Sequence, residues 1–174
     1  MDDSSSDPGV APVLQVAHTN AQVESHVRTA LQADAPRIAL VGGERGQRQQ
    51  TFGRVMDLSD ENALQFRAAS LVGERRKHTQ NSLRKAFDSG AEERALLYID
   101  DLDALLTWHH VDERDAAAED DATPSTVEYF FQRVESYPHP IVLGVENAVH
   151  VDTIRQCAPS LIVTHDGVGT SSAA

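Results

Sequence analysis

Two adjacent aspartates follow a short apolar run near the middle of the chain. Residues 96–99 are Leu-Leu-Tyr-Ile, and Asp100 and Asp101 come directly after them. When a buried strand ends in two carboxylates, the first can bind magnesium or its bound water. The second can then orient an attacking water as a general base. Acidic residues also commonly begin the helix that follows a strand, so the pair alone is equally compatible with a structural cap formed by Asp101 or Asp103.

A glycine-rich turn follows another apolar run, residues 37–41, and carries Gly42, Gly43 and Gly46. Glycines let backbone N–H groups approach a phosphate closely, and the start of the next helix adds partial positive charge. A turn of this kind between a strand and a helix therefore predicts a phosphate-binding loop, with a plain tight turn as the alternative.

The residues that complete a phosphate-binding loop differ from the usual ones. A lysine normally reaches the terminal phosphates and a serine or threonine binds magnesium, whereas this chain has Gln47 and Arg48 at these places. Glu44 also brings a negative charge close to the expected phosphates. Arg48 could supply charge to a phosphate or could fill the site and exclude the metal, and we favour exclusion.

Apolar, β-prone runs predict the strands that must position these residues. The expected strands are residues 37–41, 64–68, 96–99, 141–145 and 161–163. Most of these runs are continuously apolar and are separated by about 15 to 40 residues, as in parallel sheets with helical crossovers. The predicted fold is an α/β domain with a five-stranded, mainly parallel sheet flanked by helices, and ligands would bind at the carboxyl ends of its strands.

Apolar residues spaced by three and four predict the helices between these strands. One helix should start near Ser125 and bury Phe130, Phe131 and Val134. Another should follow a capping-box spacing at Thr19, with Asn20 as the alternative N-cap.

Over residues 17–167 the chain resembles the large nucleotide-binding subdomain of AAA+ ATPases. Residues 95–106, Ala-Leu-Leu-Tyr-Ile-Asp-Asp-Leu-Asp-Ala-Leu-Leu, resemble the family's Walker B strand and the helix after it. Residues 70–74 and 81–87 resemble its pore-loop segment, and residues 141–147 resemble its sensor-one strand. The resemblance implies a P-loop NTPase sheet with strand 37–41 at the centre and strand 141–145 beside it.

The resemblance also implies roles for individual residues. Asp100 would hold the position linked to magnesium, Asp101 would replace the catalytic glutamate, and Asn147 would orient water or contact the terminal phosphate. ATP and magnesium would be the ligands, with Gly42, Gly43, Gly46, Gln47 and Arg48 against the nucleotide. Other AAA+ subunits would be the expected partners, because the family commonly assembles into oligomeric rings.

Departures from the family pattern weaken the expectation of catalysis. The Walker A lysine and hydroxyl are replaced, Asp101 is shorter than glutamate, and the lid subdomain has no counterpart in the sequence. Arg155 is the only arginine after Asn147 that could serve as an arginine finger. We therefore expect a module that binds ATP weakly and hydrolyses it poorly, which leaves open whether it is an enzyme. The alternative is a nucleotide-independent regulatory or scaffold subunit.

A basic cluster, residues 75–78, follows the pore-like segment. It could bind an acidic partner or a nucleic acid strand, or could simply be the solvated start of a helix. Leu71 stands where members of the family that thread polypeptides usually have an aromatic residue, which disfavours threading.

Composition narrows the class of protein further. The 174 residues include 15 Lys plus Arg against 27 Asp plus Glu, for a net charge of −12. This charge disfavours general nucleic-acid binding. No run approaches the roughly 20 apolar residues of a membrane-spanning helix, and the acidic start is unlike a secretory signal, so we expect a cytoplasmic protein. The scarcity of lysine beside arginine fits both salt adaptation and codon bias.

The polar ends, residues 1–16 and 168–174, are expected to be disordered tails around the domain at 17–167. The acidic, alanine-rich stretch 112–121 is expected to be a loop. Cys157 is expected to be a structural thiol, since a single cysteine forms no internal disulfide. The pair His109 and His110 near Asp112 lacks further ligands at metal-binding spacing.

Overall fold

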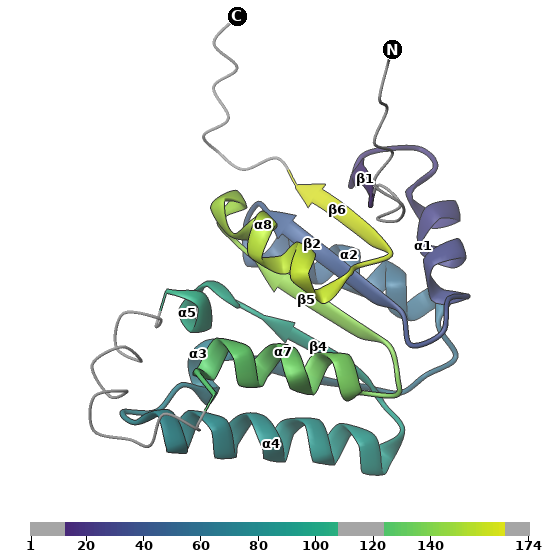
Figure 1. Ribbon diagram of the computed structural model, residues 1–174. Coiled ribbons are helices and arrows are strands. Elements are labelled where there is room, and N and C mark those ends of the chain that lie inside the picture. The colour runs from purple at the N-terminus through teal and green to yellow at the C-terminus, as the bar shows by residue number, and fades with distance from the viewer. Residues whose placement is uncertain (1–12, 108–123, 166–174) are drawn as a thin grey trace, which may run out of the picture.

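The sheet in the computed structural model, which describes residues 13–107 and 124–165, has six strands. They are β1 (Leu14–Ala17), β2 (Arg37–Gly42), β3 (Ala63–Arg67), β4 (Leu96–Asp100), β5 (Ile141–Val145) and β6 (Leu161–His165). Every pairing is parallel, in the order β1-β6-β2-β5-β4-β3 (Figure 1). The α/β prediction is confirmed, and the architecture is compatible with a Rossmann-like or P-loop-like fold.

The predicted number of five strands is wrong, because β1 adds a sixth. β1 pairs with β6 from Leu14 opposite Leu161 to Ala17 opposite Thr164, so the ordered domain begins before residue 17. Only Val16 of its four residues is buried, which left little apolar pattern to recognise. The other five strands lie where the apolar runs predicted them: β5 has the predicted ends, and the ends of the other four differ by at most two residues.

The helices in the described part of the chain connect these strands. They are α1 (Val23–Leu31), α2 (Arg45–Leu58), α3 (Ala68–Leu71), α4 (Arg76–Glu93), α5 (Asp103–Leu106), α7 (Thr126–Ser136) and α8 (Val151–Ile154), with 3-10 turns η1 (Ala148–His150) and η2 (Arg155–Cys157). The predicted start of α7 is confirmed: Ser125 Oγ accepts from the Glu128 N–H at 3.1 Å, and the Glu128 carboxylate accepts from the Ser125 N–H. α1 begins after Gln22, whose N–H bonds to the Asn20 side chain, and not through the predicted Thr19 box.

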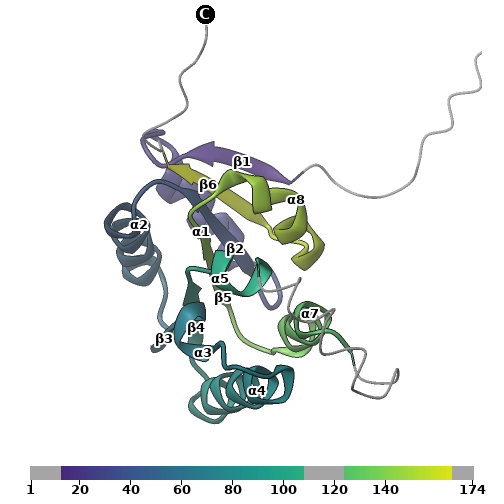
Figure 2. The same ribbon diagram turned by 90° about the vertical axis from the view of Figure 1, so that its left-hand side faces the viewer.

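Helices cover both faces of the sheet, as Figure 2 shows along its edge. Ile38 and Leu40 of β2 belong to the apolar core under α1 and α2. Ala39 and Val41 belong to the core under α4 and α7. Because successive residues of a strand face opposite sides, this alternation requires both faces to be apolar. Every residue of β2, β4 and β5 is accordingly buried.

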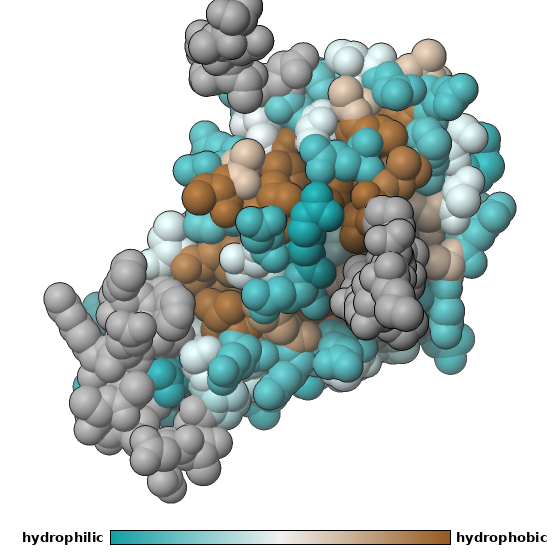
Figure 3. All heavy atoms as spheres, turned by 45° about the horizontal axis from the view of Figure 1, so that its top comes forward, coloured by the Kyte–Doolittle hydropathy of each residue, from teal (hydrophilic) through white to brown (hydrophobic). Residues whose placement is uncertain are grey.

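The surface differs from this apolar interior. Brown hydrophobic residues are interspersed with teal hydrophilic residues on the face in Figure 3. In residues 13–107 and 124–165, the large hydrophobic side chains that are exposed belong to Leu14 and Val149. Within the same residues, no helix has the length and apolar character needed to span a bilayer.

Arg37, at the start of β2, joins this strand to the end of α7 and to the loop before β5. Its guanidinium is buried and donates to the carbonyl oxygens of Val134 and Tyr137, both at 2.6 Å, and of His139 at 2.8 Å. It also donates to the carbonyls of Ala35 and Pro36. Burial lowers the pKa of Arg37 from its ordinary value. The Val134 carbonyl also accepts the Tyr137 N–H at 3.3 Å, so Arg37 adds a second donor there and supplies one to the Tyr137 carbonyl after the helix.

We predict that Arg37→Met lowers the free energy of unfolding by about 2 to 3 kcal/mol, because buried carbonyl groups lose their donors. Urea denaturation followed by far-UV circular dichroism measures this loss. Arg155→Met is the control: Arg155 is exposed and, within the described part of the chain, its side chain makes one hydrogen bond, to Gln15 at 3.3 Å. Equal stability losses in the two variants would contradict the structural role of Arg37.

Candidate functional site

The glycine-rich turn links β2 to α2 at the carboxyl edge of the sheet. Gly42 and Gly43 have φ angles of +82° and +66°, in the left-handed region that favours glycine. A Cβ on Gly42 would lie 2.7 Å from the carbonyl oxygen of His165, and one on Gly43 would collide with the Gln47 side chain. A Cβ on Gly46 would meet nothing within 4 Å. The first two glycines are therefore required by the backbone, and Gly46 is not required sterically.

Gln47, at the position of the usual lysine, folds back over the turn. Its Oε1 accepts the backbone N–H of Glu44 at 2.9 Å, next to the start of α2. Glutamine three residues after an N-cap residue commonly makes this bond and satisfies an otherwise unpaired donor. Gln47 thus has a local structural role at the place where a phosphate-binding loop needs a free cation.

Arg48, at the position of the magnesium-binding hydroxyl, is among the largest fully buried side chains. Its Nε donates to Oδ1 of Asp100 at 2.9 Å, and its Nη1 donates to the carbonyl oxygens of Gly43 at 2.9 Å and Gly42 at 3.2 Å. Nη2 lies 3.3 Å from Oδ1 of Asp101. The guanidinium thereby joins the glycine turn to the carboxylates at the end of β4.

The charge of Arg48 is stabilised inside the protein. Burial disfavours the charged form, but hydrogen bonding and Coulomb attraction to Asp100 outweigh burial and raise the pKa of Arg48 above its ordinary value. The Arg48 and Asp100 side chains are only 1% and 2% exposed. Removing either partner of such a pair is strongly destabilising, because the other partner is left as a buried, uncompensated charge.

Asp101 is surrounded by arginines. Its Oδ2 accepts from Arg67 at 2.8 Å and from Arg45 at 3.0 Å, while its Oδ1 faces Arg48. Its φ angle of +54° lies in the left-handed region, where non-glycine residues are uncommon. Both carboxylate oxygens are already paired, which leaves Asp101 poorly placed to activate a water.

Gly144 of β5 makes room for the Asp100 carboxylate. A Cβ at residue 144 would overlap Oδ1 of Asp100 directly. The glycine inside the apolar strand 141–145 therefore has a steric reason that involves the site on the neighbouring strand β4.

We predict that Gly144→Ala lowers stability by about 1 to 3 kcal/mol, since the new methyl group displaces Asp100 from Arg48. Gly53→Ala is the matched control, because a Cβ there meets nothing within 4 Å and Gly53 lies within α2. That control should gain about 0.5 to 1 kcal/mol. Thermal and urea unfolding measure the stability of both variants. A Gly144→Ala variant as stable as the wild type would contradict this account.

Asn147 lies beyond β5 and is used for local structure. Its Oδ1 accepts the N–H of Val149 at 3.0 Å, which caps η1. Asp103 holds the same loop by accepting the N–H groups of Glu146 at 2.7 Å and of Asn147 at 2.9 Å. His150 Nε2 lies 3.6 Å from Asp103. Among the described residues, Asn147 forms no hydrogen bond to the Arg48 cluster.

The structure thus brings together most, but not all, of the predicted site residues. Gly42, Gly43, Arg48, Asp100 and Asp101 form one bonded cluster, whereas Gln47 caps the turn and Asn147 caps η1. Sequence reasoning missed Arg45 and Arg67 as partners of Asp101. It treated Asp103 only as a possible helix cap.

The residues at this site do not fit a bound magnesium nucleotide. The Asp100 carboxylate that would face the metal is held by Arg48, and the Gly42 and Gly43 carbonyls point at the same guanidinium. Within residues 13–107 and 124–165, no group of three His, Cys, Asp or Glu is arranged to hold a metal ion. The candidate histidines 109 and 110, Asp112 and the 112–121 stretch lie outside the described residues. So do residues 1–12 and 168–174 of the expected tails and the last two residues of the expected domain, 166–167.

Cys157 lies beside Arg37 at the opposite edge of the sheet. Burial raises the pKa of its thiol to about 12, although the nearby Arg37 charge acts in the other direction. At neutral pH the thiol is therefore protonated and unreactive as a nucleophile.

Comparison with known proteins adds no assignment. No protein-family model matches the chain, and no curated protein matches its sequence.

Proposed function

We propose that the chain is a degenerate AAA+-type domain that acts in the cytoplasm as a nucleotide-independent regulatory or scaffold subunit. The position of β2 between β6 and β5 agrees with the strand order that the resemblance implies, and this supports the P-loop NTPase assignment. The expected partners are other protein chains, including AAA+-type subunits.

The buried pair of Arg48 and Asp100 is the observation that carries this proposal. For a magnesium nucleotide to bind, Arg48 would have to leave Asp100 and the Gly42 and Gly43 carbonyls. Breaking a buried ion pair costs about 3 to 5 kcal/mol. Such a cost reduces affinity by about two to nearly four decades, which moves a micromolar Kd to between about 0.1 mM and several millimolar.

Ligand-dependent stability tests the proposal. A nucleotide bound only by the folded state at about 100 times its Kd adds about 2.7 kcal/mol to the free energy of unfolding. We expect urea denaturation midpoints to be the same with and without millimolar ATP and magnesium, and we expect no ATP hydrolysis above background. A shift of the midpoint, or magnesium-dependent turnover that Asp100→Ala abolishes, would overturn the proposal.

A further inference from the structure

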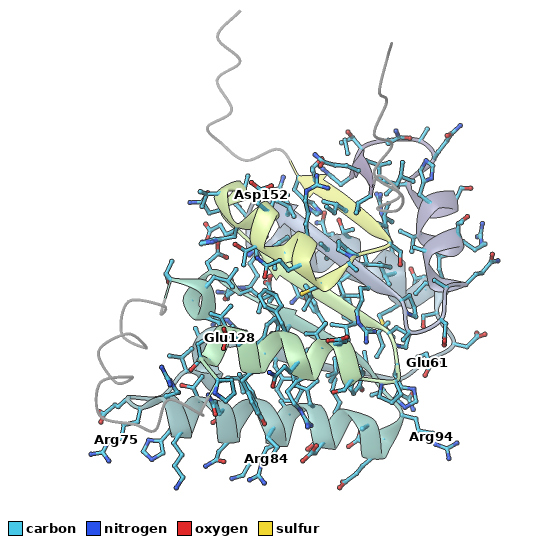
Figure 4. The ribbon with its side chains drawn as sticks, in the orientation of Figure 1. Glu61, Arg75, Arg84, Arg94, Glu128 and Asp152 are labelled. Atoms are coloured by element: carbon cyan, nitrogen blue, oxygen red, sulfur yellow. The ribbon has the colours of Figure 1, made fainter. Side chains whose placement is uncertain are left out.

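The first part of α4 is strongly basic in an acidic protein. Residues 75–85 contain five of the chain's 15 Lys and Arg residues, including both lysines, and no Asp or Glu, whereas the whole chain has a net charge of −12. Arg75, Lys77, Arg84 and Lys85 are exposed, and within the described residues none of them forms a salt bridge. Figure 4 shows Arg75 and Arg84 pointing away from the sheet.

The basic residues at the start of α4 oppose the helix dipole. The first turn of α4 contains no acidic residue and its last turn no basic one, and Glu92 and Glu93 lie at its carboxyl end. The helix dipole favours the opposite arrangement, by about 0.3 to 1 kcal/mol for each exposed charge. The helix dipole therefore does not explain the basic residues at the start of α4, and Arg84 and Lys85 lie in the middle of the helix, beyond the reach of the dipole.

A groove lies beside this basic surface, between α4 and the outermost strand β3. Its volume is about 270 Å³, and it is lined by Phe66, Leu71, Ala86, Ser82, Ser89 and Lys85. Phe66 comes from β3, which is the last strand of the sheet and lies at its outer edge in Figure 2. An edge strand presents unpaired backbone N–H and C=O groups, to which an extended segment can add as a further strand.

We propose that β3 and the basic part of α4 bind an extended, acidic segment of a partner protein. The segment would pair with the backbone of β3, place an apolar side chain in the groove and direct Asp or Glu side chains to Lys85, Arg84 and Lys77. Lys77 and Lys85 are eight residues apart, or about 12 Å along the helix. About four residues of an extended chain span the same distance.

The apolar groove favours a peptide over a nucleic acid. Phe66, Leu71 and Ala86 offer an apolar side chain a place to bury surface, but offer nothing to a phosphate backbone. The net charge of −12 also repels a long polyanion outside the immediate vicinity of α4. A short acidic segment that also gains apolar contact is less affected by this repulsion.

This inference rests on the proposed function, since it names the partner chemistry of a protein that acts by binding other chains. Selection from a library of random 12-residue peptides tests it. We expect the selected peptides to be rich in Asp and Glu and to contain alternating apolar residues. Measured by fluorescence anisotropy, the double variant Arg84→Glu with Lys85→Glu should bind the best peptide about tenfold or more weakly than the wild type does.

The matched control is Arg28→Glu with Arg54→Glu, which changes the net charge equally on exposed residues of α1 and α2, across the sheet from α4. This control should bind the peptide as the wild type does. Equal weakening in both double variants, or selected peptides without acidic residues, would overturn the inference. Tighter binding of a 20-nucleotide thymidine strand than of any selected peptide would overturn it in favour of a nucleic acid.

ATP titration of the same variants separates this inference from the proposed function. Arg84 and Lys85 lie on α4, and Arg48 lies on α2 across the sheet. The variants, like the wild type, should therefore not bind ATP. A failure of peptide binding alone would overturn the docking surface, and ATP binding alone would overturn the proposed function.

Discussion

Arg48→Met should lower the free energy of unfolding by about 3 to 5 kcal/mol, because Asp100 would remain as a buried carboxylate without a counter-charge. The Gly42 and Gly43 carbonyls would also lose their donor. Stability of a domain of this size is about 5 to 15 kcal/mol, so the loss is a large part of the total. Urea denaturation monitored by circular dichroism, with equal slopes for the two proteins, measures the effect.

Two further variants identify the cause of this loss. Arg45→Met removes a 47%-exposed partner of Asp101 and should cost no more than about 1 kcal/mol. Adding Asp100→Asn to Arg48→Met removes the buried charge and should recover part of the stability. If Arg48→Met cost no more than Arg45→Met, the buried pair would not be the centre of this site.

Restoring the usual phosphate-binding residues should create ATP binding. In Gln47→Lys with Arg48→Thr, the lysine can reach the terminal phosphates, the hydroxyl can bind magnesium, and Asp100 is released from the guanidinium. Each charge-assisted contact contributes about 1.5 to 3 kcal/mol, so binding should tighten by about two decades or more. Isothermal titration calorimetry with ATP and magnesium measures the change.

The single variant Gln47→Lys is the control for this gain. It adds the lysine but keeps Arg48 on Asp100, so it should bind little better than the wild type. Circular dichroism must show that the double variant is folded. A folded double variant that binds no more tightly than the single variant would contradict the claim that Arg48 blocks the site.

The fold was largely predictable from apolar patterning. Strands such as 37–41 and 141–145 are buried on both faces, so their continuous apolar runs stand out from the amphipathic helices. β1 was missed because three of its four residues are exposed and its place depends on pairing with β6. Short edge strands of this kind are specified by tertiary contacts more than by their own residues.

The site was predictable in its positions but not in its contacts. The Gln47 and Arg48 replacements were visible in the sequence, and so was the choice between charge supply and exclusion. The direction of the Arg48 side chain depends on Asp100, on the Gly42 and Gly43 carbonyls and on the space above Gly144, which belong to three different strands or turns. The roles of Arg67 and Asp103 likewise arise only after the strands assemble.

We propose that Arg48 takes the place of the lysine and the magnesium that would otherwise hold the phosphates of a nucleotide. Calorimetric titration of the wild-type protein with ATP and magnesium tests it most directly, in both low salt and molar potassium chloride because the acidic composition fits salt adaptation. We predict no heat of binding up to millimolar ATP from protein that is folded in each buffer. Binding with a Kd near micromolar in either buffer would contradict the claim.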